Sequence, residues 1–212
     1  IGERAFSGCS SLTRVTIPNG VTIISESAFK GCLNLANVTI PDSVTTIGAA
    51  AFSYCINLKS ITIPDSVTEI AASAFFYTDY YNESSNWQSG VLYIGNHLIE
   101  AKTDISSEYS VKYGTVTIAD RAFYNCNALT SIVIPDSVIR IGTRTFENCS
   151  GLTDITIPNS VTAIAAYAFY NCRSLTSITI PSRMMTVNES TFRSCRNLTS
   201  VTIPNGVITI EE

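Results

Sequence analysis

Seven cysteines and one histidine are the residues of this 212-residue chain best suited to do chemistry. Cysteine thiols form disulfides, bind metals or act as nucleophiles, and histidine acts as a base or a metal ligand. Even the closest cysteines are far apart in the sequence, so the chain lacks the C-x-x-C pairs that build most structural zinc sites. We therefore predict no metal site and no cofactor. The cysteines are Cys9, Cys32, Cys55, Cys126, Cys149, Cys172 and Cys195.

His97 is the only histidine, so any catalytic triad of the serine-protease kind would have to use it. Such a triad also needs a nucleophile and an orienting carboxylate beside the imidazole, and nothing in the sequence marks them. The chain contains no glycine-rich phosphate loop, no G-x-S-x-G and no H-E-x-x-H. We predict that the chain is not an enzyme. We expect His97 to be a solvated side chain and keep it as a candidate binding residue.

The composition excludes several classes of protein. Charged residues make up 14% of the chain, compared with about a quarter in an ordinary globular domain, and the net charge is -4. A slightly acidic chain is a poor partner for nucleic acid, and no apolar run approaches the roughly 18 residues of a membrane span. We predict no nucleic-acid partner and no membrane insertion within this chain. Hydrophobic residues, at 45%, are sufficient for a core.

A 23-residue repeat explains the cysteine spacing. Phenylalanine recurs with this period in two sets of four, each cysteine lies three positions after one of them, and each proline lies twelve after one. The phenylalanines are Phe6, Phe29, Phe52, Phe75, Phe123, Phe146, Phe169 and Phe192. Each of these residue types therefore occupies one fixed place in a repeating structural unit.

The elements of one unit follow from its pattern. Phe29, Cys32 and Leu35 recur at every third position, which predicts a short helical or 3-10 turn with one buried side. Val38 and Ile40 alternate with polar residues and predict a strand that a proline ends. A single unit cannot bury its apolar faces alone. Stacked copies can, with strands added at about 4.8 Å spacing, and we predict such a solenoid.

The span from Leu35 through Val38 to Ile40 matches the L-x-x-L-x-L pattern of leucine-rich repeats. The whole unit, A-F-x-x-C-x-x-L-x-x-[VI]-x-I-P-x-x-V-x-x-I, resembles the BspA-like subfamily. We expect a β-rich, right-handed stack of 23-residue coils, with a parallel sheet on one face and short helical or 3-10 turns opposite. The resemblance implies secreted or cell-surface proteins of host-associated microbes, some of them adhesins.

The repeat is interrupted once. The interval between Phe75 and Phe123 is slightly more than twice the period, so we predict one solenoid over residues 1–212 with an insertion at about 76–108. The apolar segments 91–94 and 98–101 flank Gly95-Asn96 and predict a β-hairpin. Four aromatic residues of the insertion are candidates for ligand binding, because such side chains are common at interfaces. These are Tyr80, Tyr81, Trp87 and Tyr93. The alternative is that they pin the hairpin to the solenoid.

The exposed side of the main strand provides a second candidate surface. Its central rank consists of Thr16, Thr39, Thr62, Thr156, Thr179 and Thr202, with Val133 in the equivalent place of one coil. Repeat proteins often bind extended ligands on such a face. The alternative is that threonine only keeps a β-strand soluble. For the cysteines, an odd number in an apolar position favours reduced, structural thiols over disulfides.

Together with the resemblance to BspA-like repeats, which implies the location, these features predict an extracellular or cell-surface binding scaffold for adhesion or protein interaction, whose ligand is an extracellular protein or a glycan. The alternatives are a passive spacer array and a carbohydrate-targeting module of a larger surface protein. We expect the chain to be a fragment of a longer array, with any signal or anchor lying outside it.

Overall fold

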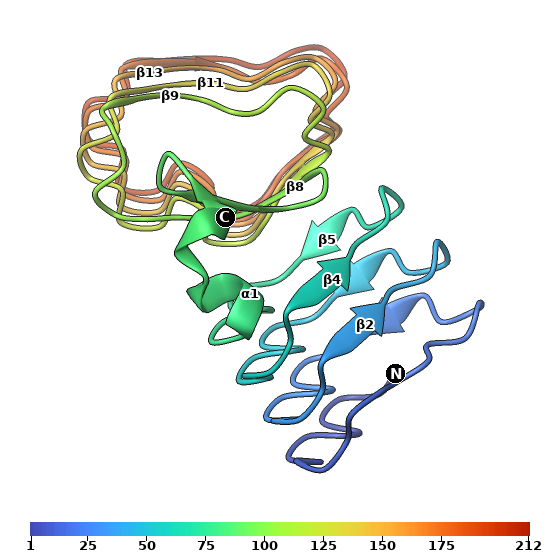
Figure 1. The fold of residues 1–212 in the computed structure, drawn as a ribbon. Helices are drawn as coiled ribbons and strands as arrows, with labels where there is room; N and C mark the ends of the chain where they lie inside the picture. The colour runs from blue at the N-terminus through green and yellow to red at the C-terminus, as the bar shows by residue number, and fades with distance from the viewer. The chain divides into compact units, whose positions relative to one another are not determined.

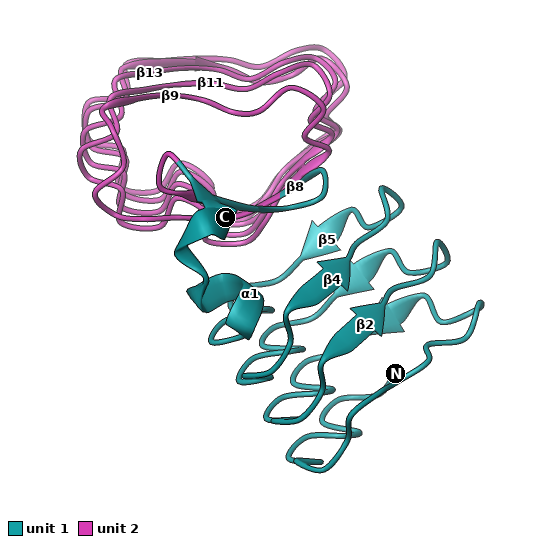
Figure 2. Cartoon of the chain, in the orientation of Figure 1, with its two compact units in different colours: residues 1–88, 92–97 teal, residues 89–91, 98–212 magenta.

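The computed structural model describes residues 1–212, which form two compact units. Unit 1 comprises residues 1–88 and 92–97, and unit 2 comprises residues 89–91 and 98–212 (Figure 2). Within each unit the chain winds through repeated coils of the same path, as the nearly superimposed turns of unit 2 make plain in Figure 1. The predicted β-solenoid is thereby confirmed.

Unit 1 contains two kinds of short parallel strand. The main strands β2 (Asn37–Thr39) and β4 (Ser60–Thr62) pair with each other, and Arg14 forms an isolated bridge to Asn37. The return strands form a second sheet in the order β1-β3-β5. Their bounds are β1 (Ile23–Ile24), β3 (Thr46–Ile47) and β5 (Glu69–Ile70).

Unit 2 repeats the same two strands in each coil. The main strands are β9 (Glu108–Ser110), β11 (Ser131–Val133), β13 (Asp154–Thr156), β15 (Ser177–Thr179) and β17 (Ser200–Thr202). The return strands are β10 (Thr117–Ile118), β12 (Arg140–Ile141), β14 (Ala163–Ile164), β16 (Thr186–Val187) and β18 (Thr209–Ile210). Paired strands are in register, so equivalent residues of neighbouring coils face each other, as Ser131 and Asp154 do.

The core is built from columns of identical residues. Phe29 and Phe52 are fully buried, and their rings stack with centroids 5.3 Å apart and planes 6° from parallel. Unit 2 repeats this arrangement, with Phe123 and Phe146 at 5.3 Å and 11°. A single residue type per column fits because the coil spacing leaves room for one ring per layer.

The cysteine column also satisfies backbone groups. The thiol of Cys149 donates to the carbonyl of Phe123 at 3.1 Å, and Cys172 donates likewise to Phe146. Burial raises the pKa of the Cys55 and Cys126 thiols to about 12, so both stay protonated and able to donate. All seven cysteines are free thiols, of which Cys9 is exposed.

The side of each coil opposite the main strand is a series of consecutive turns. Within a coil, the amide of Cys32 donates to Phe29 at 3.1 Å, in the hydrogen-bonding pattern of a 3-10 turn. Every second amide of the turn instead donates to a carbonyl of the next coil, as the amide of Phe29 does to Ala51 at 2.8 Å. The residues two before and two after each repeat phenylalanine have positive φ, for example Ser27 at 55° and Gly31 at 71°. These left-handed residues prevent a regular helix from propagating.

The inserted segment contains the elements that the repeat lacks. It begins with the one-turn helix α1 (Asp79–Asn82) and the 3-10 turn η1 (Ser84–Asn86). Strands β6 (Trp87–Gln88), β7 (Val91–Ile94) and β8 (His97–Ala101) follow, and a turn at residues 95–96 joins the last two. These two strands and their turn match the hairpin expected from the sequence.

Hydrogen bonds to the next coil begin within the inserted segment. The register that places Tyr109 opposite Ile132 confirms the alignment of β9 with the repeat. The amide of Ala101, however, already donates to Ala122, as a repeat phenylalanine donates to the alanine of the next coil. Ala101, which lies within the expected insertion, therefore already pairs with the next coil. Because this coil contains neither the repeat phenylalanine nor the repeat cysteine, its alignment with the other coils is difficult to read from the sequence.

We predict that Cys149→Ala lowers the free energy of unfolding by about 1–2 kcal/mol, because it leaves a small cavity and removes the hydrogen bond to Phe123. Cys9→Ala, at an exposed position of the same column, should change stability by less than about 0.5 kcal/mol. Denaturant unfolding of both variants measures this difference. Equal effects would show that the buried thiol contributes nothing specific.

Candidate binding surfaces

The exposed side of the main strands carries the predicted threonine rank. In β2, β4, β13 and β15 only the central residue is buried, so the flanking side chains project outward. Thr16, Thr39, Thr62, Thr156, Thr179 and Thr202 are all exposed. The rank is broken in unit 2, where Val133 presents an apolar side chain that is 62% exposed.

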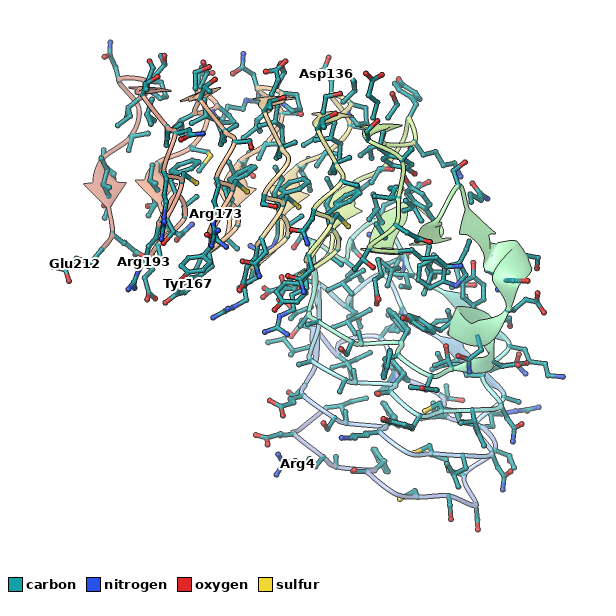
Figure 3. All side chains as sticks on the ribbon, turned by 90° about the vertical axis from the view of Figure 1, so that its left-hand side faces the viewer. Arg4, Asp136, Tyr167, Arg173, Arg193 and Glu212 are labelled. Carbon is teal, nitrogen blue, oxygen red and sulfur yellow. The ribbon has the colours of Figure 1, made fainter.

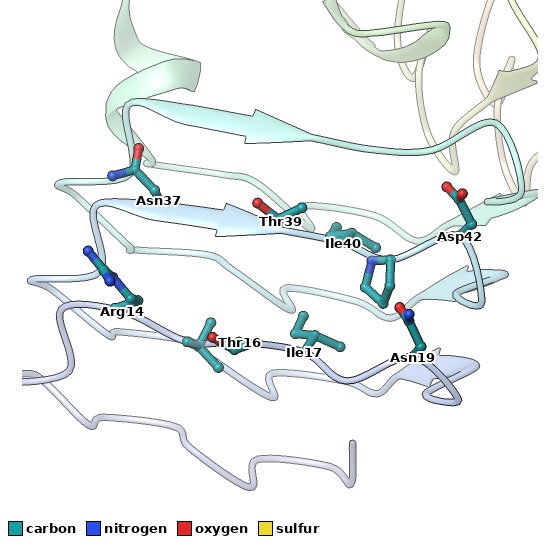
Figure 4. A pocket seen from close by; sticks show the side chains of 10 residues that line it. Arg14, Thr16, Ile17, Asn19, Asn37, Thr39, Ile40 and Asp42 are labelled. Carbon is teal, nitrogen blue, oxygen red and sulfur yellow. The ribbon is translucent and has the colours of Figure 1, made fainter.

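In unit 1 the threonine rank borders a groove of about 560 Å³ (Figure 4). Thr16 and Thr39 lie along its middle, between Arg14 and Asn37 at the beginning of the strands and Asp42 beyond their ends. The short threonine side chains leave this space open, and charged or amide groups at both ends offer hydrogen bonds to a ligand.

Unit 2 has a groove of about 360 Å³ at the same positions of the repeat. Its lining includes Asp154, Thr156, Asn159, Ser177 and Thr179, which correspond to places that line the groove of unit 1. Because both grooves arise from the same positions, they follow from the repeat and not from a local irregularity.

The turn side of unit 2 is polar and carries side-chain ladders. The amide of Asn148 donates to Asn125 at 2.8 Å, and Asn171 donates to Asn148 at the same distance. Figure 3 shows Tyr167, Arg173 and Arg193 projecting from one side of this unit. These contacts fix side chains at the surface without forming a closed site.

The aromatic residues of the insertion are largely engaged with one another. Tyr80 donates its hydroxyl to the carbonyl of Tyr93 at 3.0 Å, and Trp87 donates its indole N–H to Tyr81 at 2.7 Å. The rings of Tyr81 and Trp87 meet edge to face at 5.2 Å, and Tyr81 meets Phe76 in the same way. Burial raises the pKa of Tyr80. These contacts favour the pinning interpretation over a free binding surface.

Tyr93 and His97 are buried, which makes them unsuitable as surface contacts. The expectation of a solvated His97 was wrong. The imidazole lies within unit 1, with Nε2 3.2 Å from the carbonyl oxygen of Pro64 and Nδ1 buried without a partner. Burial lowers the pKa of His97, although the Pro64 carbonyl and the carboxylate of Asp65 oppose this shift. The hairpin tip lies against the preceding coil, where Asn96 donates to Asp65 at 3.0 Å.

Tyr54 and Tyr77 form an exposed aromatic pair that was not among the residues predicted from the sequence. Tyr54 and Tyr77 are 43% and 47% exposed, and their rings stack at 5.3 Å. Tyr54 belongs to the regular repeat, and only its unusual place among small or polar residues of the same position could have drawn attention to it.

The charged groups gather into no metal-binding cluster, since no group of three or more His, Cys, Asp or Glu side chains is suitably placed. No helix is long and apolar enough to cross a membrane.

We predict that Trp87→Ala destabilises unit 1 by about 1–3 kcal/mol, because it removes a partly buried ring and the hydrogen bond to Tyr81. Tyr113→Ala removes an aromatic residue that is 87% exposed and should have little effect. The melting temperatures of the two variants provide the comparison. If Trp87→Ala melts like the wild type, the indole does not pin the insertion.

We predict that acid weakens the fold through His97. Its folded-state pKa is lowered, so the unfolded chain binds more protons between the folded pKa and the ordinary value of 6.5. The contribution to stability is complete above pH 6.5 and declines as the pH falls below it. Urea unfolding of the wild type and His97→Gln at pH values on both sides of 6.5 tests this. An identical pH dependence of the two proteins would contradict it.

Comparison with known proteins identifies the repeat. A family model described as the BspA type leucine rich repeat region matches residues 1–107 and 116–212 in six copies. No functionally curated protein matches the chain.

Several solved structures are similar. The pneumococcal vaccine antigen PcpA is 22% identical, with a TM-score of 0.56, over 90% of this chain and 57% of that chain. A leucine-rich repeat protein from Eubacterium ventriosum is 21% identical, with a TM-score of 0.53, over 92% of this chain and 71% of that chain. A leucine rich cell surface protein from Faecalibacterium prausnitzii is 28% identical, with a TM-score of 0.49, over 95% of this chain and 68% of that chain. The first two similarities show the fold, and the family match over nearly the whole sequence shows that the chain belongs to the BspA-type leucine-rich repeat family.

Proposed function

We propose that this chain is a non-enzymatic binding scaffold of a secreted or cell-surface protein. Its ligand is an extracellular protein or a glycan, held on the outward face of the main strands. Membership of the BspA-type family supports the location, because that family implies secreted or cell-surface proteins.

The observation that carries the proposal is the recurrence of one groove at the same repeat positions in both units. Each groove combines a floor of threonine side chains with polar groups at its ends, so each coil offers a few hydrogen bonds and some apolar contact. Many modest contacts on a rigid surface bind an extended ligand with little loss of conformational freedom. A ligand that spans several coils would gain affinity without any deep pocket.

The hydrogen bonds along the stack support a preformed surface. Ser60 donates to the side-chain oxygen of Asn37 at 2.9 Å, and in unit 2 Ser182 donates to Asn159 at 3.1 Å. These contacts join neighbouring coils at the edges of the threonine rank. They reduce the freedom that the side chains would otherwise lose when a ligand binds.

We predict that Thr39→Arg and Thr156→Arg, made together, abolish binding to whole epithelial cells and to a panel of immobilised extracellular-matrix proteins. Each arginine would fill its groove while occupying an exposed position, so the melting temperature should stay close to that of the wild type. Surface plasmon resonance and cell-adhesion assays measure the loss.

Thr45→Arg and Thr162→Arg form the matched control, because these exposed threonines lie further along the same two coils, outside the grooves. They should leave binding intact. Equal binding by both double variants would remove the strand face from the proposed function. A wild type that binds neither cells nor matrix proteins would favour a passive spacer.

A further inference from the structure

A column of left-handed residues runs along the turn side of each unit. The residue two places after each repeat phenylalanine has φ between 57° and 76°. In unit 2 this position holds Asn125, Asn148, Asn171 and Ser194. In unit 1 it holds Gly8, Gly31, Tyr54 and Tyr77.

The two glycines are not required by the backbone alone, since asparagine, serine and tyrosine adopt the same conformation in other coils. They are not required by crowding either. A Cβ added to Gly8 would meet nothing within 4 Å, and one added to Gly31 would lie 3.9 Å from its nearest neighbours, backbone atoms of Gly8. Their structural effect is therefore a gap of two side chains in a column that is otherwise filled.

This gap is part of a groove of about 500 Å³. Gly8 and Gly31 lie on its lining, together with Ser7, Lys30 and Tyr54. The groove also includes Arg4, whose side chain reaches away from the ribbon at one end of unit 1 (Figure 3).

Tyr54 presents an aromatic wall to this groove. One face of its ring stacks on Tyr77, with centroids 5.3 Å apart and planes 8° from parallel. The opposite face is directed toward the preceding coil, where the equivalent residue, Gly31, has no side chain to stack on it, and the long side chain of Lys30 reaches over that face instead. The ammonium group of Lys30 is 6.0 Å from the ring centre, at the outer limit of a cation–π contact. Tyr54 remains 43% exposed.

The rim supplies hydrogen-bonding groups of both kinds. Arg4 and Lys30 are donors, the carboxylate of Glu26 is an acceptor, and the Ser7 hydroxyl is both. Arg4 lies 3.8 Å from Glu26, so the two cations of the rim, Arg4 and Lys30, are offset by one carboxylate and a single net positive charge remains. A phosphate or sulfate would meet this carboxylate, whereas a purely apolar side chain would leave the charged groups without partners.

We infer that this groove binds a pyranose ring of a glycan. The apolar C–H face of the sugar would stack on the open face of Tyr54, and its hydroxyl groups would bond to the rim beside Ser7, Glu26 and Lys30. The glycine gap provides the space for the ring. The site lies on the turn side of unit 1, so it is separate from the strand-face grooves of the proposed function.

Saturation-transfer NMR on the full chain tests the inference, with methyl β-D-glucopyranoside and methyl β-D-galactopyranoside at millimolar concentration as probes. We expect transfer to at least one sugar, strongest for the ring protons of one apolar face, because that face stacks on the tyrosine. Gly31→Asn should weaken binding about tenfold or more by filling the gap, and Tyr54→Asn should do the same by removing the wall.

Both variants place asparagine in a conformation that Asn125, Asn148 and Asn171 already adopt, so the fold should be retained and circular dichroism can verify it. Asn171→Ser changes the same position in unit 2 and should leave sugar binding unchanged. Thr39→Arg should also leave it unchanged, which separates this site from the strand face. The absence of saturation transfer to both sugars, or transfer that Gly31→Asn and Tyr54→Asn do not reduce, would overturn the inference.

Discussion

Hydrogen bonding between equivalent positions of neighbouring coils is the constraint on which this structure depends. The main strand, the return strand and alternate amides of the turn all donate to a neighbouring coil. Because few buried backbone groups can be left unpaired, each coil has to follow the path of the one beside it. Equivalent side chains of successive coils then form a column. A residue type suits a position only if it can also pack against the same residue type in the neighbouring coil.

The columns explain why particular residue types recur. A phenylalanine ring stacks on its neighbours at 5.2–5.7 Å in the six repeat pairs, and an aliphatic residue of similar size would give up that aromatic geometry. The cysteine column needs a small group that is apolar enough for the core and yet able to donate to the carbonyl of a phenylalanine. A charged column would place like charges at the spacing of strands, which is unfavourable, and this accounts for the abundance of serine and threonine on the outward positions.

The proposed ligand contacts lie at positions where the stacking of coils does not constrain the residue type. On the strand face these are the threonines and the polar residues at their ends, which repeat and so favour an extended ligand. On the turn side of unit 1, the glycines of two neighbouring coils, Gly8 and Gly31, precede Tyr54 in the same column. They leave a gap there that unit 2 does not have. The proposed strand-face surface and the inferred sugar site thus both use residues that the core does not constrain.

The sequence by itself determined the period, the parallel strands, the buried columns of Phe and Cys and the exposure of the threonines, because each of these depends on which residue follows which at a fixed spacing. It could not determine how the insertion folds. His97 is buried against Pro64 and Trp87 is bound to Tyr81, since a segment outside the repeat meets partners that no periodicity predicts. The hydrogen bond from Ala101 to Ala122 within the expected insertion was also not predictable, because no phenylalanine or cysteine marks that coil. The aromatic wall of Tyr54 above Gly31 likewise depended on the tertiary structure, because residues one repeat apart become neighbours only when the coils stack.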